Sequence, residues 1–263
     1  MRVKHQNVNN DTSQKTQSKI YRTSMKRIIP WFLIAFLFIP CLTLAQKLRE
    51  DPRVKSALNL LEMWVQAQVD FERIAGISMS VVHDQELIWA RGFGYSDIES
   101  KIATTERTIY SICSISKLFT SVGILQLRDR SLLRLDDPVK DYLSWFNIKQ
   151  KYEHSPPITI EGLLTHSSGL PREADFPYWT EASFPTREQM IDHLSKQETL
   201  YPARKKYQYS NLGLSLAGEI IAKVSGKPYA EYMIENILEP LGLTDTTPEI
   251  PVEKQKGQLA LSA

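Results

Sequence analysis

Residues 108–127 read TIYSICSISKLFTSVGILQL, and the fold prediction is built outward from this stretch. Its apolar side chains recur at three- and four-residue steps, which predicts an apolar helix over residues 116–128. The residues in front of this helix are strand-like, and the change falls at Ser114-Ile115-Ser116-Lys117. This is the only Ser-x-x-Lys among the 263 residues, so it is the first candidate for chemistry.

The segments around this helix predict one hairpin and several further helices. An apolar stripe predicts a helix over residues 51–73, and two alternating runs, 77–81 and 87–95, predict an antiparallel hairpin. Other helices are predicted at 187–196, 211–224 and 229–238, and one begins at Thr159-Ile160-Glu161 and ends with Gly169 and Pro171 in C-cap positions. An isolated hairpin is marginally stable, so either the helices dominate or the sheet needs strands that this chain does not contain.

Ser114 and Lys117 are three residues apart, nearly one helical turn, so their side chains are predicted to lie on the same face. A serine hydroxyl becomes a good nucleophile when a base takes its proton. Lys117 could be that base if desolvation and the positive end of the helix lower its pKa. The alternative is an N-cap serine followed by a solvent-facing lysine, and the tetrapeptide alone favours that alternative.

A second polar segment, Tyr207-Gln208-Tyr209-Ser210-Asn211, directly precedes the helix predicted at residues 211–224. In an extended segment Tyr209 and Asn211 point to the same side. A phenol near a lysine ammonium has a lowered pKa and can serve as a base, and the amide of Asn211 could orient Lys117 and bind a substrate carbonyl. The alternative here is a core contact by Tyr209 beside a helix cap at Asn211.

Taken together, these segments resemble the serine β-lactamase-related family, in the branch of class C β-lactamases, D-alanyl-D-alanine carboxypeptidases and esterases. The resemblance runs from about Gly76 to Thr247 and includes LRLDDPVKDYL, ITIEGLLTHSSGLP and YQYSNLGLSLAGEIIAKVSGKPYAEYMIENILEPLGLTDT. It implies an α+β fold of the α/β sandwich type, in which helices pack on an antiparallel sheet beside an all-helical region.

The same resemblance implies a role for each candidate residue. Ser114 corresponds to the acylated nucleophile and Lys117 to its partner in proton transfer. Tyr209 corresponds to the general base and Asn211 to the amide that positions the substrate. The implied chemistry is acyl transfer without metal or organic cofactor, and the sequence leaves open whether Lys117 or Tyr209 takes the first proton.

The third motif of the family, K-T-G or H-x-G on a late strand, is absent, and Lys254-Gln255-Lys256-Gly257 is only a weak imitation of it. We therefore expect a C-terminally incomplete member that lacks the late strands, the last helix and half of the oxyanion hole. Two alternatives to a β-lactam hydrolase stay open. One is an esterase or D-amino-acid peptidase, and the other is a weak or inactive domain that binds penicillin or peptidoglycan. The side chains that select the substrate are expected mostly in the loop 171–185 and in the late C-terminal strands that this chain is expected to lack.

The N-terminal residues predict an export signal ahead of a single domain, residues 46–263. Residues 1–27 carry seven basic side chains and one acidic one, and residues 28–45 are uncharged and apolar. This order predicts a signal peptide, with translation starting near Met25, and an exported protein that is periplasmic or secreted. The competing interpretation is a retained anchor in the inner membrane, but the run is short and contains two prolines.

Composition and motifs exclude several other classes of function. The formal net charge is +2, and the excess of positive charge lies in the N-terminal residues, so the domain itself offers no electrostatic surface for nucleic acid. The five histidines form no ligand-like cluster with cysteine, so no metal is predicted. Cys113 is expected to be a small buried side chain, and His166 a structural residue that hydrogen-bonds near a helix end. The oligomeric state cannot be inferred from the sequence.

Overall fold

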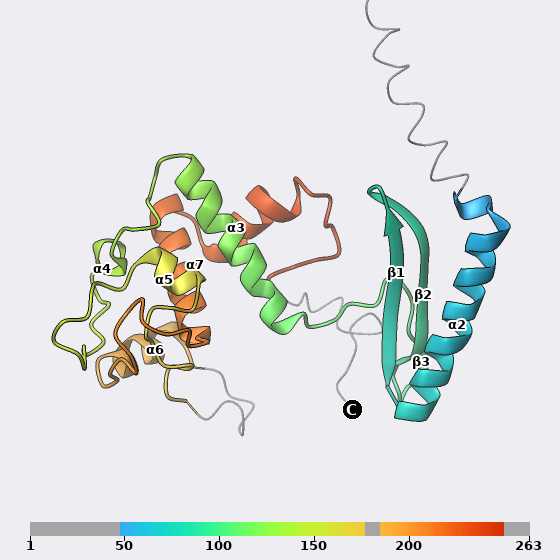
Figure 1. Cartoon of the computed structure of the whole chain (residues 1–263), viewed down its shortest axis with the longest axis horizontal. Helices are drawn as coiled ribbons and strands as arrows, with labels where there is room; N and C mark the ends of the chain where they lie inside the picture. Colours follow the sequence, from blue (N-terminus) through green and yellow to red (C-terminus); the bar gives the residue numbers. More distant parts are fainter. Residues whose placement is uncertain (1–47, 177–184, 250–263) are drawn as a thin grey trace, which may run out of the picture. The chain divides into compact units, whose positions relative to one another are not determined.

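The computed structural model describes residues 48–176 and 185–249 (Figure 1). Contacts divide the chain into residues 1–55 and 56–263, and all elements except the start of the first helix lie in the second unit. In chain order the elements are α2 (Pro52–Glu72), β1 (Gly76–His83), β2 (Glu86–Asp97), β3 (Ile102–Ala103), the 3₁₀ turn η1 (Cys113–Ile115), α3 (Ser116–Asp129), α4 (Val139–Tyr142), α5 (Ile160–Leu164), α6 (Arg187–Leu194), α7 (Asn211–Ser225), α8 (Tyr229–Met233) and the π-helical turn η2 (Ile234–Leu238). Helices and antiparallel strands occupy separate stretches, so the α+β class predicted from the sequence is confirmed.

Helix α2 begins where its sequence provides a cap. The carboxylate of Asp51 accepts a hydrogen bond of 2.8 Å from the backbone N–H of Arg53, and Pro52 occupies the first helical position, where its missing N–H is not needed. Hydrogen bonds from Arg53, chiefly from its side chain and next from its backbone N–H, lower the pKa of Asp51 to about 2.

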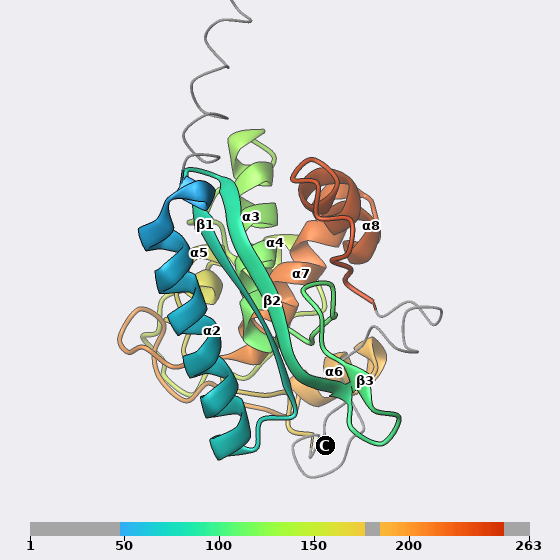
Figure 2. The same cartoon turned by 90° about the vertical axis from the view of Figure 1, so that its right-hand side faces the viewer.

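Strands β1, β2 and β3 form one antiparallel sheet in that order. The predicted hairpin is confirmed, with Ile77 opposite Phe93 and Val81 opposite Trp89, and an irregularity follows at Val82. Helix α2 lies along the hairpin, and its Val65 and Val69 form a small buried cluster with Phe93 (Figures 1 and 2). The third strand was not predicted because its two residues are too few to show an alternation.

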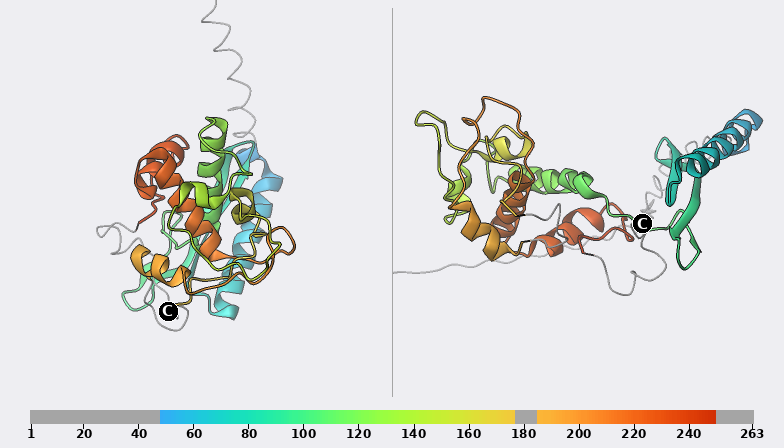
Figure 3. Two further views of the ribbon diagram at one scale, coloured as in Figure 1. Left: turned by 90° about the vertical axis from the view of Figure 1, so that its left-hand side faces the viewer. Right: turned by 90° about the horizontal axis from the view of Figure 1, so that it is seen from below.

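A larger apolar core lies between the helices that follow the sheet. Helices α3 and α7 pack against each other (Figure 3), and their Ile124, Leu216 and Ile220 are fully buried. The contact is close at Gly123, where a Cβ atom would lie within 2.9 Å of the ends of the Met233 and Ile221 side chains. This packing holds the beginnings of α3 and α7 near each other, and both candidate motifs lie there.

The helix predicted from Thr159 has the right start and the wrong end. Thr159 caps α5 by accepting a hydrogen bond of 3.3 Å from the N–H of Gly162, but the helix stops at Leu164. Gly169 and Pro171 are therefore not in C-cap positions. Instead, His166 and Gly169 both have positive φ, 56° and 77°, because the chain turns twice after the helix.

Several predictions fall on residues that the structure does not describe. The predicted leader at residues 1–27 and 28–45, the middle of the loop 171–185 and the segment Lys254–Gly257 lie outside the described residues. Within residues 48–176 and 185–249, no helix is both long and apolar enough to cross a bilayer.

Candidate active site

Ser114 lies on the short turn that leads into α3. The residue before it, Cys113, has a φ of 46°, a left-handed conformation that is uncommon for a residue with a side chain. Cys113 is the first residue of η1, and the last residue of this turn, Ile115, directly precedes α3 and has no side chain able to cap a helix. The hydroxyl of Ser114 is therefore not used as an N-cap, in contrast to the alternative that the tetrapeptide alone had favoured.

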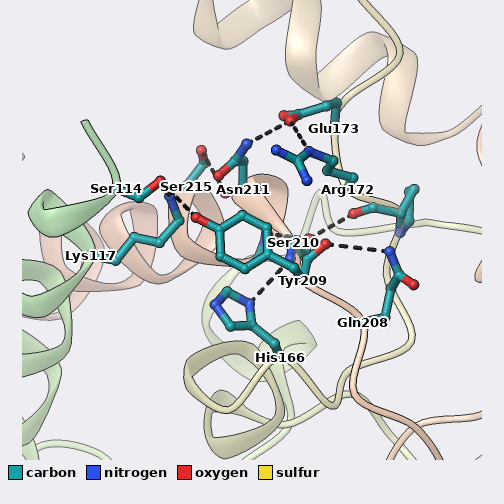
Figure 4. Close-up of polar contacts among 12 residues, drawn as sticks. Ser114, Lys117, His166, Arg172, Glu173, Gln208, Tyr209, Ser210, Asn211 and Ser215 are labelled. Atoms are coloured by element: carbon teal, nitrogen blue, oxygen red, sulfur yellow. Dashed lines mark hydrogen bonds and ion pairs between the residues drawn. The ribbon is translucent and has the colours of Figure 1, made fainter. Parts of the chain in front are cut away.

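The side chains of Lys117 and Tyr209 converge on the hydroxyl of Ser114 (Figure 4). Lys117 Nζ donates a hydrogen bond of 3.1 Å to Ser114 Oγ, and the Tyr209 hydroxyl donates one of 2.7 Å to the same atom. Lys117 Nζ also lies 5.1 Å from the centre of the Tyr209 ring. Three of the four predicted site residues thus meet at one oxygen, although Ser114 and Tyr209 are 95 positions apart in the chain.

The surroundings of Tyr209 favour its deprotonated form. The pKa of Tyr209 lies below the ordinary value of a phenol, chiefly because Lys117 donates a hydrogen bond to its oxygen, and next because of the hydrogen bond with Ser114. Partial burial opposes this shift, whereas the positive charges of Lys117 and Arg172 add to it. Arg172 contributes at close range, since its guanidinium carbon lies 5.2 Å from the centre of the Tyr209 ring.

The segment that follows α5 holds Tyr209 and its neighbours in place through main-chain contacts. The backbone N–H of Gln208 donates to the carbonyl of His166 at 2.7 Å, and that of Asn211 donates to the carbonyl of Arg172 at 2.8 Å. Between them, Ser210 Oγ donates to the carbonyl of Pro171 at 2.7 Å. Residues 166–172 thus form a cradle for Tyr-Ser-Asn, so the segment THSSGLP and the Tyr-Ser-Asn segment work as one unit.

His166 is part of this cradle, as the sequence predicted for a structural histidine near a helix end. Its Nδ1 accepts a hydrogen bond of 3.2 Å from the backbone N–H of Ser210, and its ring lies 4.5 Å from that of Tyr209, centre to centre. Accepting this bond requires a neutral imidazole. Burial, and then the positive charge of Lys117, lower the pKa of His166 and so favour the neutral form.

Asn211 lies beside this group, but its contacts differ from those expected. The cap of α7 is Ser210, whose Oγ accepts from the N–H of Gly213 at 2.9 Å, so Asn211 is not the cap residue. Its amide nitrogen donates to Glu173 at 2.5 Å, and the described residues show no hydrogen bond between Asn211 and Lys117. The expectation that Asn211 orients Lys117 is therefore replaced by an interaction with Glu173.

Glu173 and Arg172 were not singled out from the sequence. Both lie in the irregular segment after Pro171, where no periodicity indicates which side chains face inward. The side chain of Glu173 is only 13% exposed, and its Oε1 also accepts a hydrogen bond of 3.2 Å from Arg172 Nε. Only the general expectation that functional side chains lie in the loop 171–185 pointed in their direction.

Cys113 corrects one further expectation. It was predicted as a small buried side chain, but it is exposed and its Sγ lies 3.7 Å from Ser111 Oγ. The left-handed backbone at Cys113 belongs to the tight turn before α3, and this turn leaves the side chain at the surface. No group of three or more potential metal ligands occurs in the part of the chain that the structure describes, and the absence of a metal stays a prediction.

Comparison with known proteins places this geometry in a family. The model of the family described as Beta-lactamase matches residues 61–262. The chain belongs to the beta-lactamase family. The similarity thus covers the hairpin, the Ser-x-x-Lys turn and the Tyr-Ser-Asn segment together, and the family resemblance predicted from the sequence is confirmed.

Individual relatives come from bacteria, archaea and a eukaryote. Beta-lactamase-like protein 2 of Dictyostelium discoideum is 32% identical over 76% of this chain and 37% of its own length. The D-alanyl-D-alanine-carboxypeptidase/endopeptidase AmpH of Escherichia coli is 32% identical over 65% of this chain and 45% of its own. The octameric penicillin-binding protein homologue from Pyrococcus abyssi has a TM-score of 0.67 at 32% identity, covering 77% of this chain and 47% of that one.

The chain spans less than half of the length of these relatives. The catalytic roles of Ser114, Lys117, Tyr209 and Asn211 therefore stay predictions, now supported by the convergence of the first three on one oxygen.

Proposed function

We propose that this protein is an exported serine hydrolase that acts through an acyl-enzyme on Ser114. The observation that carries the proposal is the meeting of a lysine ammonium and a tyrosine hydroxyl at Ser114 Oγ, at 3.1 and 2.7 Å. A structural serine has no need of two donors on an exposed oxygen. A nucleophilic serine needs a nearby base and a group that holds the charge of that base.

The proposed reaction begins with Tyr209 as a phenolate stabilised by the Lys117 ammonium. The phenolate takes the proton of Ser114, and Oγ forms a bond to the carbonyl carbon of the substrate. The tetrahedral intermediate collapses when the bond to the leaving group breaks, and the proton held by Tyr209 passes to the leaving group. Water then attacks the acyl-enzyme by the same route, which releases the acid and restores Ser114.

Two further groups complete the proposed site. The backbone N–H of Ser114 is proposed as a donor to the oxyanion of the tetrahedral intermediate. Asn211, held by Glu173, is proposed to contact the polar part of the substrate. Substrates are acyl compounds of low molecular weight, and the names of the relatives suggest penicillins and D-alanyl-D-alanine peptides as the compounds to test first. The family resemblance of the sequence adds esters to these.

Intact-protein mass spectrometry tests this proposal directly. The purified protein is incubated with benzylpenicillin, a D-alanyl-D-alanine peptide and a p-nitrophenyl ester, and we expect at least one to add its acyl mass to Ser114. Ser114→Ala must abolish the adduct, whereas Ser111→Ala, the same change three residues earlier in the chain, must not. A stable adduct without turnover would indicate a penicillin-binding domain instead of a hydrolase. If no compound adds mass to Ser114, the proposal is wrong.

A further inference from the structure

A cavity of about 780 Å³ opens beside Ser114 and extends between α3 and α7. On α3 it is lined by Lys117 and Thr120, and on α7 by Asn211, Leu214 and Gly218, so it follows one face of each helix away from the reactive serine. The distance from Asn211 to Gly218 along the helix axis is about 10 Å, which accommodates an extended acyl chain of roughly eight carbons.

The inner wall of this cavity is apolar. Ala174, Met190, Leu212 and Leu214 line it, and each of them is buried. The ring of Tyr229 lies at the far end, where its hydroxyl is 2.7 Å from Thr120 Oγ1 and so already has a partner. A ligand group in this space gains mainly from leaving water, since these side chains offer little to hydrogen-bond.

The charged groups of the lining are paired with each other. Among the described residues that line the cavity, the charged ones other than Lys117 at the mouth are Arg187 and Glu219, whose Nε and Oε2 are 2.7 Å apart. Arg187 also stacks over Trp145, with its guanidinium carbon 5.6 Å from the ring centre. A carboxylate pushed into this space would have to compete with Glu219 for Arg187, so the cavity disfavours a charged acyl group.

We infer that this space, which we call the acyl cavity, binds an uncharged acyl chain of medium length. The preferred substrates are then esters of such acids. The inference rests on the proposed acyl-enzyme function of Ser114 and adds to it the class of acyl group. Each methylene that enters the cavity strengthens binding by up to about fourfold, because burial of a methylene group is favourable.

A series of alkylphosphonate p-nitrophenyl esters tests the inference without requiring turnover. Tyr209 takes the proton of Ser114, Oγ forms a bond to phosphorus, and the bond to the p-nitrophenolate leaving group breaks. The resulting phosphonyl adduct is stable enough to be measured by mass. We expect the second-order rate of labelling to rise at least tenfold from methyl through butyl to octyl and to fall again at hexadecyl.

Gly218→Leu should fill part of the acyl cavity. The substitution lies within helix α7, and leucine has a higher helix propensity than glycine. A Cβ atom at Gly218 would lie 3.4 Å from the Tyr229 ring, an ordinary contact, so the larger side chain extends into the cavity at little cost to the fold. We expect this variant to react with the methyl probe as wild type does and to lose the advantage of the octyl probe. Lys223→Leu is the matched control, since it places the same side chain on an exposed position of α7.

The outcomes separate this inference from the proposed function. Two results would overturn the inference about the acyl cavity and leave the proposed acyl-enzyme function standing. Either probes of all chain lengths label Ser114 at the same rate, or Gly218→Leu slows every probe by the same factor. If no probe labels Ser114 in wild type, both are wrong. Faster labelling by a probe with a terminal carboxylate than by its uncharged counterpart would also overturn the inference.

Discussion

Glu173 Oε1 accepts a hydrogen bond of 2.5 Å from the amide nitrogen of Asn211, across 38 positions of the sequence. Arg172 Nε donates to the same oxygen, and the carbonyl of Arg172 accepts from the N–H of Asn211. The side chain of Glu173 and the backbone carbonyl of Arg172 thus both hold Asn211, the first residue of α7. The orientation of the Asn211 amide therefore depends on a carboxylate outside both candidate motifs.

Glu173→Gln should slow acylation of Ser114 about tenfold, because a hydrogen bond to a charged group contributes about 1.5–3 kcal/mol and the neutral amide retains part of it. The measurement is the second-order rate of labelling by the methylphosphonate probe, with the thermal unfolding midpoint as a check on folding. Glu161→Gln is the control, since Glu161 is more than half exposed and lies 3.8 Å from Arg204. An equal loss in both variants would mean that Glu173 does not act through Asn211.

Tyr209→Phe should slow acylation by about 10²–10⁴, the usual contribution of a positioned base. The change removes the oxygen that lies 2.7 Å from Ser114 Oγ and keeps the ring that packs against His166. Tyr207→Phe provides the control, because Tyr207 also packs against His166 but is 70% exposed. If Tyr209→Phe retains most of the labelling rate, then Lys117 is the first base.

The elements that were predicted well are those that a local pattern determines. Helix α3 and the hairpin each repeat their apolar side chains at the period of their own geometry, so a short window of sequence is sufficient. The end of α5 was wrong because Gly169, although left-handed, makes a later turn, and the first left-handed residue after that helix is His166. Sequence alone does not show which of two turns closes a helix.

The candidate site was predicted to a different extent for each residue. The side chains of Ser114 and Lys117 meet because they are one turn apart, which local geometry predicts. The approach of Tyr209 was expected only from the family resemblance, since 95 positions separate it from Ser114. Glu173 was missed because it lies in an irregular segment whose path depends on tertiary contacts with residues 208–212.

Arg172→Met should shift the pH dependence of acylation toward higher pH. The pKa of Tyr209 is lowered chiefly by the hydrogen bond from Lys117 and then by that with Ser114, and the charge of Arg172 adds a smaller contribution. Acylation needs the phenolate, so its rate rises with pH through this pKa, and removing a nearby cation raises the pKa. The measurement is the labelling rate from neutral to alkaline pH. Arg172→Met should be slower than wild type at neutral pH and as fast as wild type on the alkaline plateau.

Salt provides an internal check on this prediction. At about 1 M ionic strength the screening length falls to about 3 Å, so the charge of Arg172 should matter less. The profiles of wild type and Arg172→Met should then approach each other. Profiles that stay separated by the same amount at high salt would show that Arg172 acts through packing instead of charge.

His166→Asn should make the stability of the fold less sensitive to acid. The pKa of His166 is lower in the folded protein than its ordinary value of 6.5, mainly through burial, so the unfolded chain binds the proton more readily. Stability therefore rises with pH across the window between the folded pKa and 6.5, and is lost as pH falls through it. Asparagine tolerates the φ of 56° at this position and does not titrate. The unfolding free energy of His166→Asn should therefore change less over this window than that of the wild type.

Urea unfolding between pH 5 and pH 7.5 measures this effect. His154→Asn serves as a control for the general loss of an imidazole, because His154 is exposed. If wild type and His166→Asn lose the same stability on acidification, the hydrogen bond from the Ser210 N–H to the imidazole does not depend on the charge of the ring, and the prediction is wrong.

Gly169→Ala should destabilise the protein far more than Gly226→Ala, although both glycines have nearly the same φ, 77° and 71°. An alanine in this conformation costs about 1–2 kcal/mol at either position. At Gly169 the new Cβ would also lie 2.0 Å from the carbonyl oxygen of Tyr201, whereas at Gly226 no atom of the described residues lies within 4 Å of it. The difference between the two urea unfolding free energies should therefore be about 2 kcal/mol or more, as for other substitutions that overpack a close contact.

The same substitution should also affect the candidate site. Gly169 lies between His166 and Pro171, so a displaced backbone there should slow labelling of Ser114, whereas Gly226→Ala should leave the labelling rate unchanged. Equal unfolding free energies would mean that the Tyr201 segment can move away at little cost, and an unchanged labelling rate would then show that Tyr209 is held without this turn.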